Sequence, residues 1–194
     1  MFDTIELSKK LISFDSVTPA KQDIFDFLNK IFKEQGFSTK QLNFDGDGSY
    51  EVINLMATYG STNTNAKHFN FLCHVDVVPP GNLEDWDTPP FEPVIKDGYL
   101  YGRGAEDMKG CTAASMVSVF KFLKDNKDFN GTISFIITGD EEADSVNGVD
   151  KVVNWIKENN IRIDGSIATE SSSEKIIGDQ IKVGRKGAVD IQIE

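Results

Sequence analysis

Cysteines are few in this sequence, and long apolar runs are missing. Two cysteines, Cys73 and Cys111, cannot build a disulfide framework in a chain of 194 residues. No apolar run approaches the length of a membrane-spanning helix. Residues 1–6 lack the basic region and apolar stretch of a secretory signal. We therefore expect a cytoplasmic protein with reduced thiols and no membrane partner.

Positive charge is also scarce, with 20 Lys and Arg against 31 Asp and Glu and a net charge of −11. A nucleic-acid backbone or an anionic membrane surface would repel such a chain, which argues against both as partners. Solubility alone accounts for most of the carboxylates. Hydrophobic residues make up 39% and include 14 Phe, enough for a core. The length fits one domain or a large piece of a two-domain protein.

Apolar periodicity predicts helices and strands that alternate along the chain. The expected helices span 5–12, 19–35, 107–126 and 149–159. The expected strands span 37–44, 54–59, 69–75, 132–138, 166–169, 175–183 and 187–193. This alternation predicts an α/β layered domain with a mostly parallel sheet. The long loop after residue 76 is of a length that is usually functional.

Residues able to bind metals follow the expected strands. His74, the triplet 140–142 and Glu170 lie at or just after strand ends, and Asp107 lies just before an expected helix. In sheets of this kind ligands gather at the carboxyl ends of the strands. We therefore expect these four groups to converge on one edge of the sheet.

Each group also has an ordinary interpretation. His74 alone is more often structural, Asp107 suits a helix N-cap, the acidic triplet suits a solvated turn, and Glu170 suits a turn. Taken together, an imidazole and several carboxylates favour zinc, with cobalt or manganese as alternatives. Asp76 projects on the same side as His74 and can accept a hydrogen bond from it or from a nearby base.

Two metal ions about 3.5–4 Å apart would polarise a carbonyl and lower the pKa of a bridging water. In the triplet, one Glu can bind metal while its neighbour accepts a proton, which favours hydrolysis of an amide or ester. A nucleophilic serine is disfavoured, because the sequence has no Gly-x-Ser-x-Gly motif. The run 102–104 matches neither a dinucleotide-binding fingerprint nor a P-loop.

Longer motifs strengthen this interpretation. They are His74-Val-Asp-Val-Val-Pro-Pro-Gly81, Trp86, Pro89-Pro-Phe-Glu-Pro93, Asp97-Gly98, Gly102-Arg-Gly-Ala-Glu-Asp-Met-Lys-Gly110, Asp140-Glu-Glu-Ala143, Glu170-Ser-Ser172, Gly178-Asp179 and Gly184-Arg-Lys-Gly187. Together they resemble the family of dinuclear zinc amidohydrolases and exopeptidases that includes aminoacylase, carboxypeptidase G2 and succinyl-diaminopimelate desuccinylase. The similarity to desuccinylases extends over almost the whole chain.

This resemblance implies a three-layer α/β/α zinc-exopeptidase-like domain and a set of roles. The implied metal ligands are His74, Asp107, Glu142 and Glu170, with His74 and Glu170 on one zinc, Asp107 bridging and Glu142 on the second. Glu141 is the implied general acid/base, Asp76 its support or that of His74, and Arg185 a ligand for a substrate carboxylate. The resemblance also implies a cis peptide bond between Asp107 and Met108.

The sequence departs from the family pattern in several places. Ala188 and Lys186 stand where many desuccinylases have Ser and Arg, and Glu106 stands where a small residue is usual. A final His that completes the second zinc site in the family has no counterpart here. His68 lies about 20 Å from His74 at the rise of a strand, so we expect an ordinary surface residue.

The resemblance implies that the chain is the N-terminal part of such an enzyme, with residues 1–182 in the catalytic domain and 183–194 beginning a lid domain. The implied reaction is hydrolysis of the linear amide N-succinyl-LL-2,6-diaminopimelate to succinate and LL-2,6-diaminopimelate, with two Zn²⁺ or Co²⁺ per complete site. The resemblance also implies a full-length homodimer, and we expect this chain alone to be inactive or nearly so. A related N-acyl-amino-acid deacylase or metallopeptidase, or a non-catalytic metal-binding fragment, remains an alternative.

Overall fold

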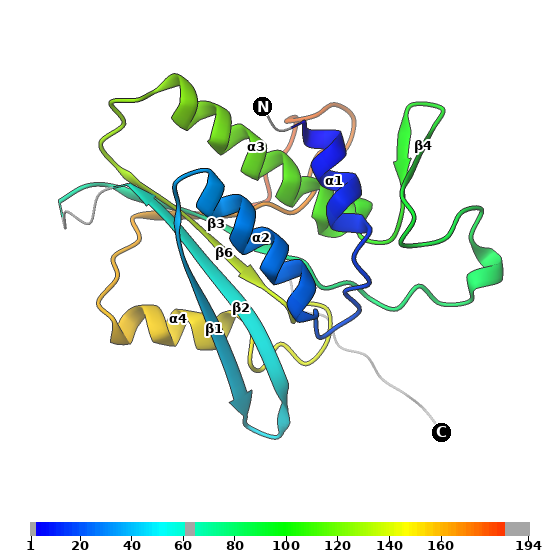
Figure 1. Ribbon diagram of the computed structural model, residues 1–194, viewed down its shortest axis with the longest axis horizontal. Helices are drawn as coiled ribbons and strands as arrows, with labels where there is room; N and C mark the ends of the chain where they lie inside the picture. The colour runs from blue at the N-terminus through cyan, green and yellow to red at the C-terminus, as the bar shows by residue number, and fades with distance from the viewer. Residues whose placement is uncertain (1–2, 61–64, 185–194) are drawn as a thin grey trace.

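The computed structural model describes residues 3–60 and 65–184 and places a five-stranded sheet between helices (Figure 1). The strands run in the spatial order β1-β2-β6-β3-β7. Their bounds are Ser38–Gly46 (β1), Ser49–Gly60 (β2), His68–His74 (β3), Thr132–Thr138 (β6) and Gly165–Ala168 (β7). β1, β2 and β6 pair antiparallel, and β6, β3 and β7 pair parallel.

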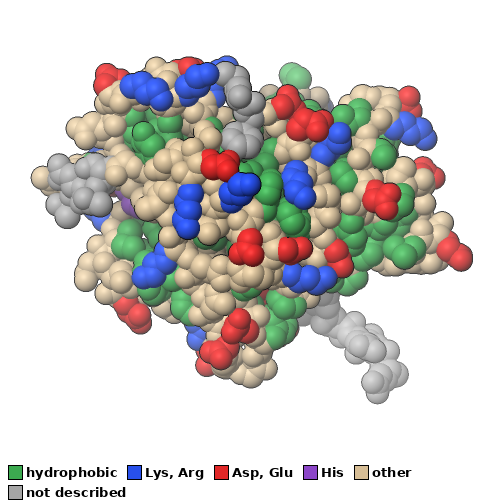
Figure 2. All heavy atoms as spheres, viewed as in Figure 1, with side chains coloured by type: hydrophobic (Ala, Val, Ile, Leu, Met, Phe, Trp, Pro, Cys, Tyr) green, Lys and Arg blue, Asp and Glu red, His purple; other side chains and the backbone are tan. Residues whose placement is uncertain are grey.

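Helices cover both faces of this sheet, as the α/β/α prediction requires. α1 (Thr4–Ile12), α2 (Gln22–Glu34) and α3 (Gly110–Asp125) lie on one face, and α4 (Val149–Glu158) lies on the other (Figure 1). Among the described residues, no helix has both the length and the apolar character needed to cross a membrane. Acidic and basic side chains are interspersed on the face drawn in Figure 2.

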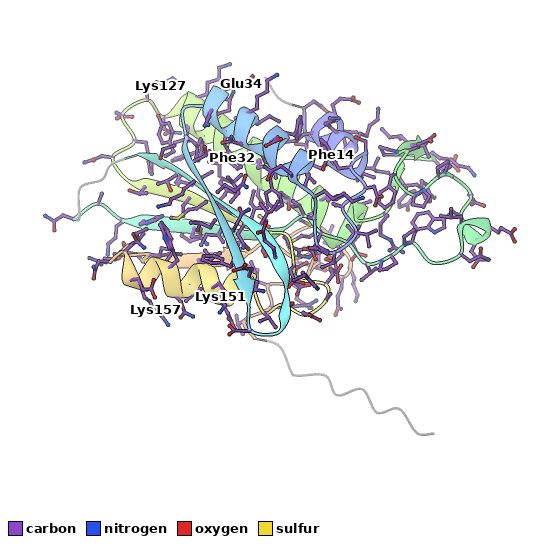
Figure 3. All side chains as sticks on the ribbon, turned by 60° about the horizontal axis from the view of Figure 1, so that its bottom comes forward. Phe14, Phe32, Glu34, Lys127, Lys151 and Lys157 are labelled. Carbon is purple, nitrogen blue, oxygen red and sulfur yellow. The ribbon has the colours of Figure 1, made fainter. Side chains whose placement is uncertain are left out.

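The larger of two apolar cores fills the space between the sheet and the three helices. Phe32 of α2 is fully buried there and contacts Phe37, Phe120 and Phe135, with ring centroids 5.1–5.8 Å apart (Figure 3). Aromatic pairs at such distances add stability beyond their burial. A smaller core, built around Ile136, lies beneath α4.

The parallel part of the sheet brings the predicted ligand segments together. His74 at the end of β3 lies opposite Thr138 at the end of β6, and Leu72 lies opposite Ala168 of β7. The segments that follow these three strands therefore meet at one edge. The expectation from strand order alone is confirmed at this level of the fold.

The loop after β3 contains structure that the sequence pattern did not predict. It has a 3-10 turn at Leu83–Asp85 and a hairpin of β4 (Val94–Lys96) and β5 (Tyr99–Tyr101). In the first part of the loop, the Trp86 indole donates to the carbonyl of Pro80. The guanidinium of Arg103, near the end of the loop, lies 5.1 Å from the centre of the Trp86 ring. These contacts fasten the loop at the point where the chain approaches Asp107.

Other expectations were wrong. Residues 175–183 form no strand, and Ile177 and Val183 are fully exposed. The third long helix begins at Gly110 and not at Asp107. The expected strand 187–193, the lid segment from 185 onward and Arg185 lie outside the described residues.

Candidate metal centre

His74 ends β3 with its ring almost fully buried, 1% exposed. Its Nδ1 lies 3.1 Å from the main-chain oxygen of Asp76. Because a carbonyl only accepts hydrogen bonds, this contact favours a proton on Nδ1. Nε2 then lies beside the carboxylate of Asp107 and can offer its lone pair to a metal ion when it carries no proton. A histidine held this way by a carbonyl has the usual arrangement of a metal ligand.

Three carboxylates surround the Nε2 atom of His74. Asp107 Oδ1 lies 2.9 Å from it, Glu170 Oε1 3.4 Å and Glu141 Oε2 3.9 Å. His74, Asp107 and Glu170 offer ligand atoms within 4.8 Å of one another, and so do His74, Glu141 and Glu142. The structure therefore brings together all four predicted ligands and the predicted base, in two groups that share His74.

Asp107 reaches the cluster through an irregular segment, Ala105–Lys109, and not through a helix N-cap. Its backbone (φ −113°, ψ 101°) is extended, and its peptide bond to Met108 is cis, as the resemblance implied. Gly104 precedes the segment with φ +79°, and a Cβ there would lie 2.6 Å from Val77. The tight approach and the positive φ together require glycine at this position.

Asp76 is completely buried, and its carboxylate binds the main chain of the acidic triplet 140–142. Its oxygens accept from the main-chain nitrogens of Glu141 (3.0 and 3.1 Å) and Glu142 (3.0 Å) and from Thr18 Oγ1 (2.8 Å). The carboxylate lies farther from the imidazole, 3.6 Å from His74 Nδ1. Asp76 therefore holds the main chain of Glu141 and Glu142, while its own main-chain oxygen orients His74.

The electrostatics of the cluster follow from this crowding of carboxylates. Burial lowers the pKa of His74, but Asp76 and Glu170 more than offset it and raise that pKa to about 11. Burial raises the pKa of Glu141, and the Glu170 carboxylate adds to the rise against the opposing effect of His74. Burial also raises the pKa of Glu142, with Asp107 adding to it. Such crowding of carboxylates favours a bound cation.

The donor set fits a divalent metal ion. One imidazole nitrogen and several carboxylate oxygens suit zinc, and also cobalt or manganese. His74, Glu141 and Glu170 line a cavity of about 1020 Å³, in which a small substrate has room. The donors do not distinguish between metals, and the bridging role of Asp107 remains a prediction.

Two contacts of the site were not predicted from the sequence. Thr18 binds Asp76 from a segment 58 residues earlier, and Met108 Sδ lies 3.2 Å from the main-chain nitrogen of His74. Neither residue type signals a metal site. His68 was expected on the surface but is buried, with Nδ1 2.8 Å from the Arg162 carbonyl oxygen and Nε2 2.8 Å from Ser134 Oγ.

Relatives share both the sequence and the fold. The chain is 42% identical over 192 residues to succinyl-diaminopimelate desuccinylase of Pelagibacter ubique, covering 99% of this chain and 49% of that protein. It is 42% identical over 189 residues to the Coxiella burnetii protein of the same name, covering 97% of this chain and 48% of that one. The chain thus spans about half the length of these relatives.

Solved structures of other proteins have a similar fold. Human carnosine dipeptidase 1 superposes with a TM-score of 0.75 at 25% identity, covering 87% of this chain and 38% of that one. Aminopeptidase PepT from Bacillus cereus gives 0.62 at 28% identity, covering 88% and 43%. Residues 71–193 match the model of peptidase family M20/M25/M40. On the fold, the clustered ligands and this match, the chain belongs to peptidase family M20/M25/M40.

Proposed function

We propose that this chain is the metal-binding part of a hydrolase that cleaves the amide bond of N-succinyl-LL-2,6-diaminopimelate to succinate and LL-2,6-diaminopimelate. The observation that carries the proposal is the meeting of His74, Asp107, Glu170 and the pair Glu141–Glu142 around one imidazole ring. The substrate comes from the desuccinylases that the chain resembles at 42% identity. The products place the reaction in the diaminopimelate route of lysine biosynthesis.

His74, Asp107 and Glu170 would hold one ion, and Glu142 would contribute to a second, with Asp107 between them. Zn²⁺ or Co²⁺ suits these donors and, when bound, supplies a Lewis acid that polarises the scissile carbonyl. Residues 1–182 would form the catalytic part, and 183–194 would begin a lid domain. A full-length homodimer in the cytoplasm fits the proposal.

Glu141 is the group that we assign to proton transfer. Its side chain is 46% exposed, and Oε2 faces the cluster from 3.9 Å. A carboxylate so placed can take a proton from the attacking water and deliver it to the leaving amine. Asp76 holds the Glu141 main chain, so that the side chain keeps its direction during the transfer.

The chain holds two histidines, and His68 belongs to a separate polar network that starts at the opposite end of β3. The donors for a second ion are therefore carboxylates, with His74 engaged at the first. For this reason we expect little or no turnover from this chain on its own.

Zinc binding tests the proposal directly. We expect a single tightly bound Zn²⁺ by calorimetric titration and elemental analysis, and we expect His74→Ala and Glu170→Gln to abolish it. His68→Gln is the matched control, because it changes a histidine of the same strand outside the cluster. A parent chain without Zn²⁺ affinity, or a His74→Ala chain that binds as tightly as the parent, would refute the proposed centre.

A substrate panel separates the alternatives. The Zn²⁺- and Co²⁺-loaded chain is assayed at high protein concentration with N-succinyl-LL-2,6-diaminopimelate, N-acetyl amino acids and dipeptides. Residual turnover confined to the succinyl substrate supports the main proposal. Preference for another N-acyl amino acid or a dipeptide supports a related deacylase or peptidase. Tight metal binding without turnover of any substrate, both by this chain and by the full-length protein that contains it, supports a metal-binding fragment.

A further inference from the structure

We propose that the tip of the β1–β2 hairpin, residues 46–50, positions the Glu141–Glu142 pair through Tyr50 and Asn147, which makes these two positioning residues of the metal centre. This inference rests on the proposed function, because it concerns the placement of a proposed base and ligand. The segment 139–148 joins β6 to α4 and contains neither helix nor strand. Its conformation therefore depends on contacts made with other parts of the chain.

The first contact holds the start of this segment. Tyr50 Oη donates to Asp140 Oδ1 at 2.9 Å and accepts from the Asp144 main-chain nitrogen at 3.4 Å. Asp140 is 1% exposed, and its Oδ2 has no hydrogen-bond partner among the described residues. A buried carboxylate with so few donors depends strongly on each of them. The Tyr50 hydroxyl therefore fixes the residue directly before Glu141.

The second contact holds the end of the segment. The fully buried Asn147 donates from Nδ2 to the carbonyls of Gly46 (3.2 Å) and Tyr50 (2.8 Å). The main-chain carbonyl of Asn147 accepts from Asn54 Nδ2 at 3.1 Å. Because both Gly46 and Tyr50 offer carbonyl oxygens, the amide is oriented with its nitrogen toward the hairpin. The hairpin tip is thus bonded to both ends of the segment.

Weaker contacts support the same attachment from outside. Ser49 Oγ donates to Asp144 Oδ2 at 2.8 Å, and Lys151 of α4, labelled in Figure 3, pairs with Asp47 at the tip. On the opposite side, Asp76 accepts from the Glu141 and Glu142 nitrogens. The acidic pair is therefore held between Asp76 and the hairpin tip.

The hairpin tip lies outside the part of β2 that pairs with β6. β2 pairs with β6 only from Asn54 to Gly60, so residues 46–50 lie beyond this ladder. Loss of a tip contact should loosen the segment 140–147 locally and leave β6 intact. A purely structural contribution of Tyr50 would instead lower protection across the whole domain.

Amide hydrogen exchange of the metal-free chain, followed by NMR, tests this difference in Tyr50→Phe. We expect protection of the Glu141 and Glu142 amides to fall about tenfold, the effect of losing one hydrogen bond to a charged group. Protection within β6 should not change. Tyr59→Phe is the matched control, since it removes a hydroxyl from the same strand, where the Tyr59 ring packs against Phe37. Asn147→Ala should exceed the effect of Tyr50→Phe; if it does not fold, Tyr50→Phe still decides.

Calorimetric titration with Zn²⁺ supplies the second readout. We expect affinity to fall severalfold in Tyr50→Phe and to stay at the parent value in Tyr59→Phe. Unchanged exchange at Glu141 and Glu142, equally faster exchange throughout β6, or unchanged Zn²⁺ affinity would each overturn the inference. A parent chain that binds no Zn²⁺ would remove the proposed function and with it the positioning role, whereas failure of Tyr50→Phe alone would leave the proposed function standing.

Discussion

Replacing Asp76 should show how much its hydrogen bonds to the acidic pair, Glu141 and Glu142, contribute to the free energy of unfolding. The buried carboxylate accepts from two main-chain nitrogens and one hydroxyl, all within 3.1 Å. In Asp76→Asn an amide oxygen can occupy the Oδ2 position and keep all three donors. The three bonds then lose their charge assistance, and the amide nitrogen faces the Glu141 nitrogen. At roughly 0.5–1 kcal/mol for each bond, we expect a loss of about 2 kcal/mol.

Two further variants give this prediction a scale. Asp76→Ala removes the acceptor for every donor and should lower the free energy of unfolding by about 4 kcal/mol. Thr18→Val removes a single donor with little change in shape and should cost about 1 kcal/mol. The order Thr18→Val, Asp76→Asn, Asp76→Ala follows directly from the number and charge of the bonds lost.

The assay is urea denaturation of the metal-free chain at neutral pH, followed by tryptophan fluorescence and circular dichroism together. Coincident transitions justify a two-state analysis, and equal slopes confirm that the variants expose the same surface. A loss below about 0.5 kcal/mol in Asp76→Asn would refute the reasoning. That result would mean that the amides of Glu141 and Glu142 are held equally well by a neutral acceptor.

Three other predictions address the core, a glycine and a titrating group. Phe32→Ala should lower the free energy of unfolding by about 3–5 kcal/mol, measured by urea denaturation, and a loss under about 2 kcal/mol would contradict the close packing of the Phe32 ring. Gly104→Ala should cost clearly more than Gly48→Ala in the same assay; both glycines have φ +79°, but only Gly104 would bring a Cβ against Val77, so equal losses would contradict the close approach. Burial lowers the pKa of His68 below 6.5, despite the opposing hydrogen bond to the Arg162 carbonyl. The unfolded chain therefore takes up the proton first, and the folded state loses stability as the pH falls below about 6.5. The parent should therefore lose more stability than His68→Gln between about pH 7 and 5, and parallel stability curves would contradict it.

Regular apolar patterns carried most of the fold prediction. The three- and four-residue spacing in α2 and the compact run of β3 describe elements that bury one side or both, so the pattern reports the burial directly. The alternating residues 175–183 failed because a strand also needs a partner, and none lies beside them among the described residues. The β4–β5 hairpin was missed although Asp97-Gly98 is a recognised turn signal, and both residues have the positive φ of such a turn.

The candidate site was predictable in its residue types and not in its attachments. Strand ends located His74 and the acidic triplet, because side chains there must lie at the edge of the sheet. Asp107 was expected to begin a helix, which starts instead at Gly110, since its kinked backbone depends on contacts of Gly104 that composition does not report. Thr18 and Tyr50 bind the site through single hydroxyls from distant segments. Residues of these types are common, so only the three-dimensional contacts distinguish them.

The charges at the centre explain why so many attachments are needed. Asp107, Glu141, Glu142 and Glu170 lie close enough to repel one another, and the partial burial of Glu141 and Glu142 adds to the cost of keeping them charged before a cation arrives. Without these attachments the side chains would separate into solvent, and the free-energy cost of ordering them would weaken metal binding. Hydrogen bonds to the main chain of Glu141 and Glu142 and to Asp140 keep the segment in place without neutralising the carboxylates that face the cavity. The fold thus places these hydrogen bonds on the backbone and leaves the side chains of Glu141 and Glu142 to the cluster, an arrangement that suits binding a metal better than it suits the stability of the metal-free chain.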